Sequence, residues 1–120
     1  MNPAELFRQD TDTVSLSPGQ ALFKAGEMGD EMFVVIEGVV DISIGGTVVE
    51  TATSGALIGE MALIEEAPRA ATVTAKTQSR LARIDEQRFH SLIQQNPAFA
   101  SQVMKTLVDE REEALLINPG

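Results

Sequence analysis

The feature that most constrains the fold of this chain is a series of short apolar segments between Thr13 and Asp85, separated by turn signals. These segments are residues 13–17, 21–24, 32–36, 40–44, 47–51, 72–76 and 80–84. Glycine and proline residues stand between them, and Gly45-Gly46 is a typical two-residue hairpin turn. Many short strands with turns at such intervals favour a sandwich or barrel of antiparallel strands over a parallel sheet.

The hydrophobic period changes from strand to helix after Asp85. Phe89, Leu92 and Ile93 are spaced for one face of a helix, which Asn96-Pro97 should end. A second, longer helix should follow. At the other end, residues 3–9 favour a short helix with proline in its first turn. We therefore expect one domain over residues 1–120, made of an N-terminal helical segment (1–12), a β-roll (13–85) and two C-terminal helices (86–118).

The composition excludes several classes of protein. There is no cysteine and only one histidine, His90, so disulfides, thiolate metal sites and sites that need two imidazoles are excluded. We accordingly expect neither a bound metal nor an enzyme. Apolar runs end after a handful of residues, whereas a membrane span needs about 20. No signal peptide is visible at the N-terminus, so we expect a cytoplasmic protein with no membrane partner.

The charge is acidic and unevenly distributed. The net charge is −9; residues 1–68 hold twelve acids and two bases, and residues 69–120 hold six acids and seven bases. A nucleic-acid-binding domain normally presents a basic face. With no basic run and no residues after 120 for a helix-turn-helix, we expect that this chain alone does not bind nucleic acid. A small anion could bind only where a local arrangement overcomes the repulsion.

The segment from Ile58 to Val73 does not follow the strand pattern. Gly59 allows a tight entry, and residues 60–64 favour about one helical turn before a loop. The free N–H groups of such a turn and the planar guanidinium of Arg69 could hold the same anion, while Glu60 could accept hydrogen bonds from hydroxyl groups. This pattern indicates a site for a phosphate joined to a sugar. The alternative is a surface turn in which Arg69 pairs with Glu65 or Glu66.

The same segment resembles the phosphate-binding cassette of cyclic nucleotide-binding domains, as in protein kinase A regulatory subunits and the bacterial catabolite activator protein. The pattern Gly-Glu-x-Ala-Leu-x-x-x-x-Pro-Arg-Ala-Ala-Thr-Val is matched over residues 59–73 without a gap. The family's upstream signature is matched by Gly26-Glu27-x-Gly29-Asp30 and by Gly38. The likeness covers roughly residues 13–118. It implies a mainly β fold, an eight-stranded jelly roll with a short internal helix and C-terminal helices.

The resemblance also implies roles for individual residues. Glu60 would bind the ribose 2′-hydroxyl, and Arg69 would hold an oxygen of the cyclic phosphate. The backbone N–H groups of Ala62 and Ala70 would complete the anion cradle, and Gly59 would let the backbone approach the ribose. The implied ligand site comprises Gly59, Glu60, Met61, Ala62, Arg69, Ala70, Ala71 and Arg111.

The identity of the base is implied less directly. In relatives that prefer cGMP a threonine often stands at the position of Ala70 and bonds the guanine amino group, so the alanine implies cAMP. The base would be capped by Arg111 or by an apolar residue among Leu115–Ile117. A solvated Arg111 among acidic neighbours is the alternative.

The resulting hypothesis is a cAMP-binding regulatory module without a cofactor, in which the ligand stabilises one placement of the last helix. Its partners would be an effector protein or a second copy bound through that helix. One alternative is a member of the fold that binds no ligand and serves as a protein-interaction module. Another is a cupin-type jelly-roll enzyme, which would need several histidine ligands.

Overall fold

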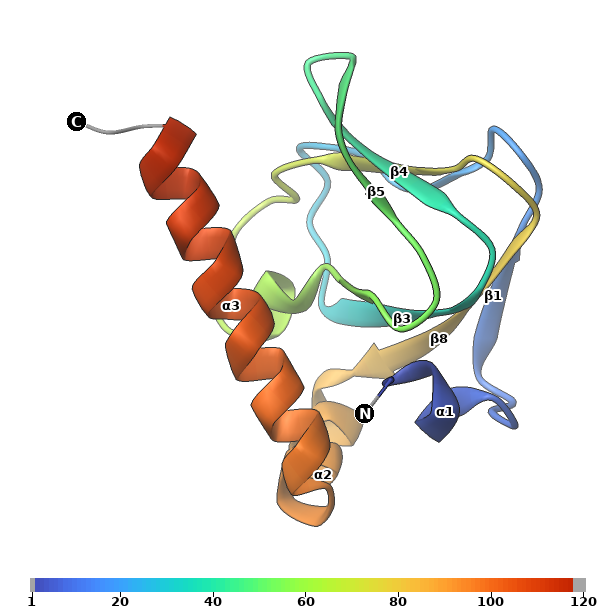
Figure 1. Cartoon of the computed structure of the whole chain (residues 1–120), viewed down its shortest axis with the longest axis vertical. Coiled ribbons are helices and arrows are strands. Elements are labelled where there is room, and N and C mark those ends of the chain that lie inside the picture. Colours follow the sequence, from blue (N-terminus) through green and yellow to red (C-terminus); the bar gives the residue numbers. More distant parts are fainter. Residues whose placement is uncertain (1, 118–120) are drawn as a thin grey trace.

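Eight strands form two antiparallel sheets, and the helices lie on one side of them (Figure 1). The computed structural model describes the backbone of residues 2–117 and the side chains of residues 2–109. The elements in chain order are α1 (Ala4–Phe7), β1 (Thr13–Leu16), β2 (Ala21–Phe23), β3 (Glu31–Glu37), β4 (Val40–Ile44), β5 (Thr47–Ala52), β6 (Leu57–Ile58), the 3₁₀ helix η1 (Glu60–Leu63), β7 (Thr72–Ala75), β8 (Ser79–Asp85), α2 (Glu86–Gln95) and α3 (Pro97–Ile117). The sheet orders are β1-β8-β3-β6 and β2-β7-β4-β5. The expected fold class is confirmed.

Strand β3 separates two hydrophobic cores because successive side chains of a strand point to opposite faces. Met32 and Val34 contribute to the core beneath the helices, whereas Phe33 and Val35 contribute to the core between the sheets. Met32, Val34 and Val35 are completely buried. The apolar run 32–36 has no alternating polar positions, and such a run predicts a strand buried on both faces, as β3 is.

The helices cover the outer face of the first sheet. Phe7 of α1, Phe89 of α2 and Phe99 of α3 all join the core beneath them. Helix α2 begins where the Asp85 carboxylate accepts a 2.8 Å hydrogen bond from the backbone N–H of Arg88, a standard N-cap. Helix α3 then runs along the side of the roll, past η1 (Figure 1). None of the helices in the described part of the chain is long and apolar enough to cross a membrane.

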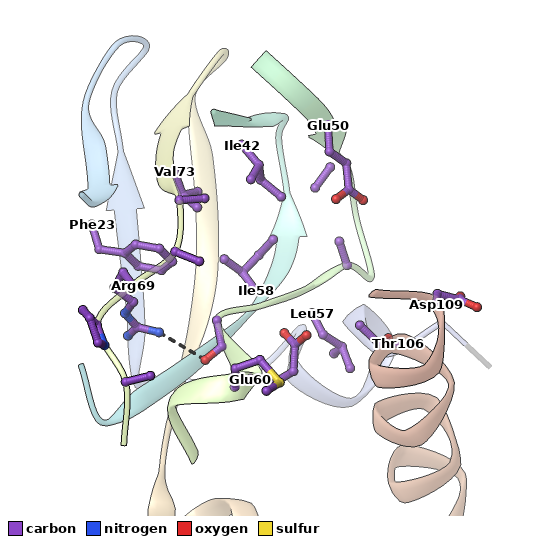
Figure 2. A pocket seen from close by; sticks show the side chains of 18 of the residues that line it. Phe23, Ile42, Glu50, Leu57, Ile58, Glu60, Arg69, Val73, Thr106 and Asp109 are labelled. Carbon is purple, nitrogen blue, oxygen red and sulfur yellow. Dashed lines mark hydrogen bonds between the residues drawn. The ribbon is translucent and has the colours of Figure 1, made fainter. Parts of the chain in front are cut away.

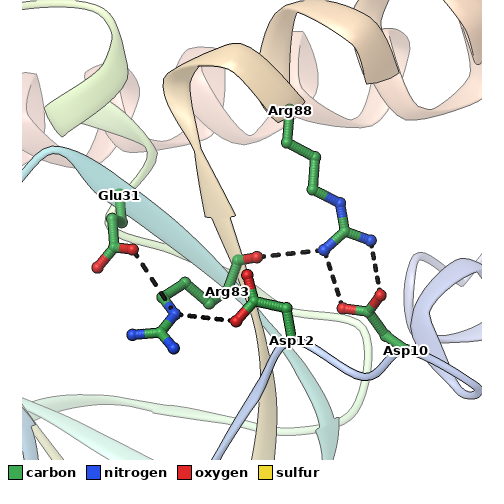
Figure 3. A network of polar contacts seen from close by, with 5 residues as sticks. All are labelled: Asp10, Asp12, Glu31, Arg83 and Arg88. Carbon is green, nitrogen blue, oxygen red and sulfur yellow. Dashed lines mark hydrogen bonds and ion pairs between the residues drawn. The ribbon is translucent and has the colours of Figure 1, made fainter.

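A polar network joins the N-terminal segment to this helical side (Figure 3). Both terminal nitrogens of Arg88 donate to the carboxylate of Asp10 at 2.9 Å. The carbonyl of Arg83 accepts a further bond from Arg88, and the Arg83 side chain pairs with Asp12 at 3.1 Å and with Glu31 at 3.7 Å. The bond to Asp10 raises the pKa of Arg88. These contacts fasten residues 10–12 to β8 and α2.

The segment between Ile58 and Val73 differs in detail from the sequence expectation. Leu57 and Ile58 form a two-residue strand, β6, paired with β3. The single helical turn that follows is a 3₁₀ helix, and it ends one residue earlier than the predicted 60–64. So short a strand carries no alternation that could mark it in the sequence, and it forms only because β3 pairs with it.

Candidate anion-binding pocket

A pocket of about 610 Å³ opens between the second sheet, the 59–71 segment and α3 (Figure 2). Apolar side chains from three strands, Phe23, Ile58 and Val73, form much of its wall. Thr106 and Asp109 of α3 border it on another side. This size and a mainly apolar lining with few polar groups are typical of small-molecule sites.

Arg69 stands at one end of this pocket, held by two backbone carbonyls. Its Nη1 donates to the Gly59 carbonyl at 3.1 Å and its Nη2 to the Glu31 carbonyl at 2.8 Å. Its guanidinium carbon lies 4.1 Å from the centre of the Phe23 ring. Because an arginine carries five N–H donors, this arrangement leaves donors for an anion.

The charge of Arg69 has no ion-pair partner among the described residues. Partial burial lowers the pKa of Arg69. Nearby acids, Glu31 foremost, raise this pKa and so offset part of the effect of burial. The ion pairs within the described part of the chain join other residues, and neither Glu65 nor Glu66 pairs with Arg69. The structure therefore does not contain the alternative, a surface turn in which Arg69 forms an ion pair with Glu65 or Glu66. A half-buried cation with carbonyl bonds alone is suited to bind an anion.

Two glycines give the Arg69 guanidinium its space. A Cβ atom built on Gly29 or on Gly59 would collide with that group. Gly59 also has φ +73°, in the left-handed region that favours glycine. Both positions therefore need glycine if Arg69 is to lie where it does.

Glu60 is a buried carboxylate in the wall of the same pocket. Its exposed fraction is 1%, and neither carboxylate oxygen has a hydrogen-bond partner among the described residues. Buried polar atoms are almost always hydrogen-bonded, and leaving one without a partner costs about 1–3 kcal/mol. The residue also lines the pocket, so a hydroxyl-bearing ligand bound there is a candidate partner for these oxygens.

The structure brings together most of the residues that the sequence singles out. Those that line the pocket are Gly59, Glu60, Met61, Arg69, Ala70 and Ala71. Ala62 is half-buried and does not line it, and its N–H donates to the Gly59 carbonyl at 3.2 Å. Arg111 and Leu115–Ile117 fall outside the residues whose side chains are described.

Other residues of the site are not evident in the sequence. Phe23, Thr106 and Asp109 line the pocket, and Glu31 supplies a carbonyl to Arg69. The 21–24 segment is too short for alternation to show which side chain points inward. Gly29 does stand in the matched upstream signature, which is the one sequence signal for that part of the site.

In chemical terms the pocket combines an anion-binding end with an unpaired hydrogen-bond acceptor. Gly59 connects the two groups: it directly precedes Glu60 in the chain, and its carbonyl accepts a hydrogen bond from Arg69. The rest of the wall is mainly apolar. This arrangement suits a molecule that carries an anionic group, a neighbouring hydroxyl and a flat apolar part.

Comparison with protein families agrees with this description. The model of the cyclic nucleotide-binding domain matches residues 13–96. A cyclic nucleotide-gated potassium channel of Rhizobium etli is 37% identical over 93 residues, which are 78% of this chain and 26% of the channel. A cAMP-dependent protein kinase regulatory subunit of Yarrowia lipolytica is 38% identical over 80 residues, which are 65% of this chain and 21% of that subunit.

The chain therefore spans about a quarter of the length of these curated relatives. Among solved structures, one from work on a cyclic-GMP-dependent signalling pathway that regulates bacterial phytopathogenesis has a TM-score of 0.77 and 26% identity. That match covers 94% of this chain and 95% of the solved one.

Proposed function

Since the chain belongs to the cyclic nucleotide-binding domain family, we propose that its pocket binds cAMP and that the domain is a regulatory module rather than an enzyme. In this proposal Arg69 binds the cyclic phosphate and Glu60 the ribose 2′-hydroxyl. Gly59, Met61, Ala70 and Ala71 surround the ligand, the N–H group of Ala70 contributes to the anion cradle, and Arg111 or an apolar neighbour caps the base. The N–H group of Ala62, also expected in the cradle, donates to the Gly59 carbonyl instead and is left out of the proposal.

The observation that carries this proposal is the state of Glu60. A carboxylate that is 1% exposed and has no partner among the described residues requires a hydroxyl or water to satisfy it. Arg69, a cation with no ion pair among the described residues, lines the same pocket (Figure 2). A cyclic nucleotide carries an anionic phosphate and a ribose 2′-hydroxyl in one rigid unit, which satisfies both groups together.

Two observations favour cAMP over cGMP as the ligand. Ala70 has no hydroxyl for a guanine amino group, and one relative is a cAMP-dependent kinase subunit. One solved structure of similar fold comes from work on a cyclic-GMP-dependent pathway. Both nucleotides therefore have to be tested.

The proposed regulation acts through α3. Thr106 and Asp109 of this helix line the same pocket as the cassette residues. A ligand that contacts both the roll and α3 would stabilise one placement of the helix, which is a population shift. The helix would pass this change to a cytoplasmic effector protein or to a second copy of the chain.

Isothermal titration of the chain with cAMP and with cGMP tests the proposal. We expect one site per chain and tighter binding of cAMP. Because a ligand that binds only the native state raises the melting temperature, cAMP should shift thermal unfolding upward. If millimolar concentrations of either nucleotide give neither heat nor a shift, the proposal is wrong and the interaction-module alternative is favoured.

A further inference from the structure

The β4–β5 hairpin contains a β-bulge that decides which side chain faces the pocket. Ile42 is paired with Glu50, but the next residue, Ser43, is paired with Val48. Val49 therefore has no partner in the ladder and is the bulged residue. Bulges of this kind turn a side chain toward a functional site in many proteins.

Without the bulge the hairpin would present a different wall. Continued from the Gly45-Gly46 turn, a regular register would pair Ile42 with Val49 and Asp41 with Glu50. Directly opposed like charges destabilise an antiparallel pair. The observed register instead pairs Asp41 with Thr51, whose hydroxyl donates to the Asp41 carboxylate at 2.9 Å.

The bulge thus places Glu50 on the inner face. Residues directly opposite each other on neighbouring strands share a face, and Ile42, the partner of Glu50, packs against the core between the sheets. Both line the pocket. Figure 2 shows Glu50 and Ile42 on the same side of the strands, with Glu50 across the pocket from Arg69.

Apart from Arg69, the polar side chains that the structure describes in the pocket wall are available as hydrogen-bond acceptors. Asp109 carries a carboxylate, and Thr106 donates its hydroxyl proton to the Gln102 carbonyl at 3.0 Å, which leaves only its lone pairs for a ligand. Apart from Arg69 and Thr106, the polar side chains described in the pocket wall are carboxylates. Ionised carboxylates only accept hydrogen bonds.

We infer that Glu50 reads the base of the bound nucleotide by accepting a hydrogen bond from its amino group. The inference rests on the proposed function, because it is the placement of phosphate at Arg69 and ribose at Glu60 that sends the base toward Glu50. Adenine carries such an amino group at C6 and guanine at C2. A base with a carbonyl group at the position facing Glu50 would place its oxygen, a hydrogen-bond acceptor, against the Glu50 carboxylate, which is also an acceptor.

The test compares nucleotides that differ only in the amino group. cAMP is compared with purine riboside 3′,5′-cyclic monophosphate, which lacks the 6-amino group, and cGMP with cIMP, which lacks the 2-amino group. Titrations use wild type, Glu50→Ala and Glu66→Ala. The last variant removes the same charge from an exposed residue outside the pocket wall. Thermal unfolding without ligand checks that each variant is folded.

We expect loss of the amino group to weaken binding to wild type and to Glu66→Ala about tenfold or more in one of the two pairs, since hydrogen bonds to charged groups are the stronger ones. In Glu50→Ala the two members of that pair should bind equally. The pair that responds identifies the base.

The inference is overturned if both pairs show the same ratios in Glu50→Ala as in wild type, or if the amino group never matters. In those cases wild type still binds cyclic nucleotides and the proposed function stands. If wild type binds none of the four nucleotides, the proposed function itself is wrong, and the inference is wrong with it.

Discussion

The guanidinium of Arg69 lies over the ring of Phe23, with its central carbon 4.1 Å from the ring centre. The two residues come from separate parts of the chain, β2 and the end of the 59–71 segment, and both line the pocket. The ring therefore helps to hold the guanidinium in place, alongside the carbonyls of Gly59 and Glu31.

Replacement of this ring should weaken ligand binding without unfolding the chain. Phe23→Leu keeps an apolar side chain of similar reach but removes the stacking surface, so binding of cAMP should fall about 2–10-fold, the range expected for a cation–π contact. Isothermal titration measures this loss. An unchanged affinity would show that the two carbonyls alone orient Arg69.

Arg69 itself should be far more sensitive. Arg69→Ala should cost roughly 2–5 kcal/mol of binding free energy, as for the loss of one member of a buried charge pair. Arg69→Lys should recover little because lysine lacks the planar fork. The control is Arg80→Ala, which removes a cation whose side chain pairs with Glu37 away from the pocket. Wild-type affinity in Arg69→Ala would mean that the pocket is assigned wrongly.

Glu60 should respond to the sugar rather than to the phosphate. Glu60→Ala should weaken cAMP binding less than Arg69→Ala does, because it removes a hydroxyl contact and not the phosphate's cation. With 2′-deoxy-cAMP, wild type and Glu60→Ala should bind nearly equally. Titration of both proteins with both ligands gives a double-mutant cycle, and strictly additive losses would contradict the assigned contact.

The stability of the chain should depend on pH through Glu31. Burial is the largest cause that raises the pKa of this carboxyl; Arg83 lowers it, and Asp12, Asp30 and Asp85 raise it further. A carboxyl with a raised folded-state pKa costs stability while it is charged, so the cost is present above that pKa and disappears as the pH falls below the unfolded-state value.

Glu31→Gln should therefore melt at a higher temperature than wild type at pH 7, and the difference should close as the medium is acidified. Thermal unfolding from pH 7 to pH 3 measures it. Glu66→Gln, at an exposed position, is the control for removing one acid from a chain of net charge −9. A constant difference between Glu31→Gln and wild type across this range would contradict the assignment.

The last part of α3 should respond to the ligand. Asp109 lines the pocket, and the helix continues to Ile117. Helix ends that move on ligand binding belong to the less stable parts of a fold, so their amides exchange readily in the free chain. When the helix closes against bound cAMP, the amides of residues 109–117 should exchange their hydrogens more slowly. Hydrogen exchange measures this protection. The truncation after Val108 should also weaken binding, and full affinity in the truncated chain would show that the helix is no lid.

Local features of the sequence predict much of the fold. The glycine pair at 45–46 predicts the turn between β4 and β5, and the apolar run 32–36 predicts a strand buried on both sides. The change of period after Asp85 predicts both C-terminal helices. Such features depend on neighbours a few residues apart, so they can be read without knowing the packing. Glu60 and Arg69 can be recognised in the same way, because both stand in one continuous motif of the sequence.

The contacts that make those residues a site depend on segments far apart in the chain. Arg69 bonds to the carbonyl of Glu31, 38 residues away. The bulge at Val49 turns Glu50 inward, whereas the hairpin turn followed by regular alternation would place Val49 there. The sequence by itself determined which elements form and which residues carry the charge. Only the tertiary structure decided what each charge faces, because strand register and burial minimise the free energy of the whole packed chain rather than of any one segment.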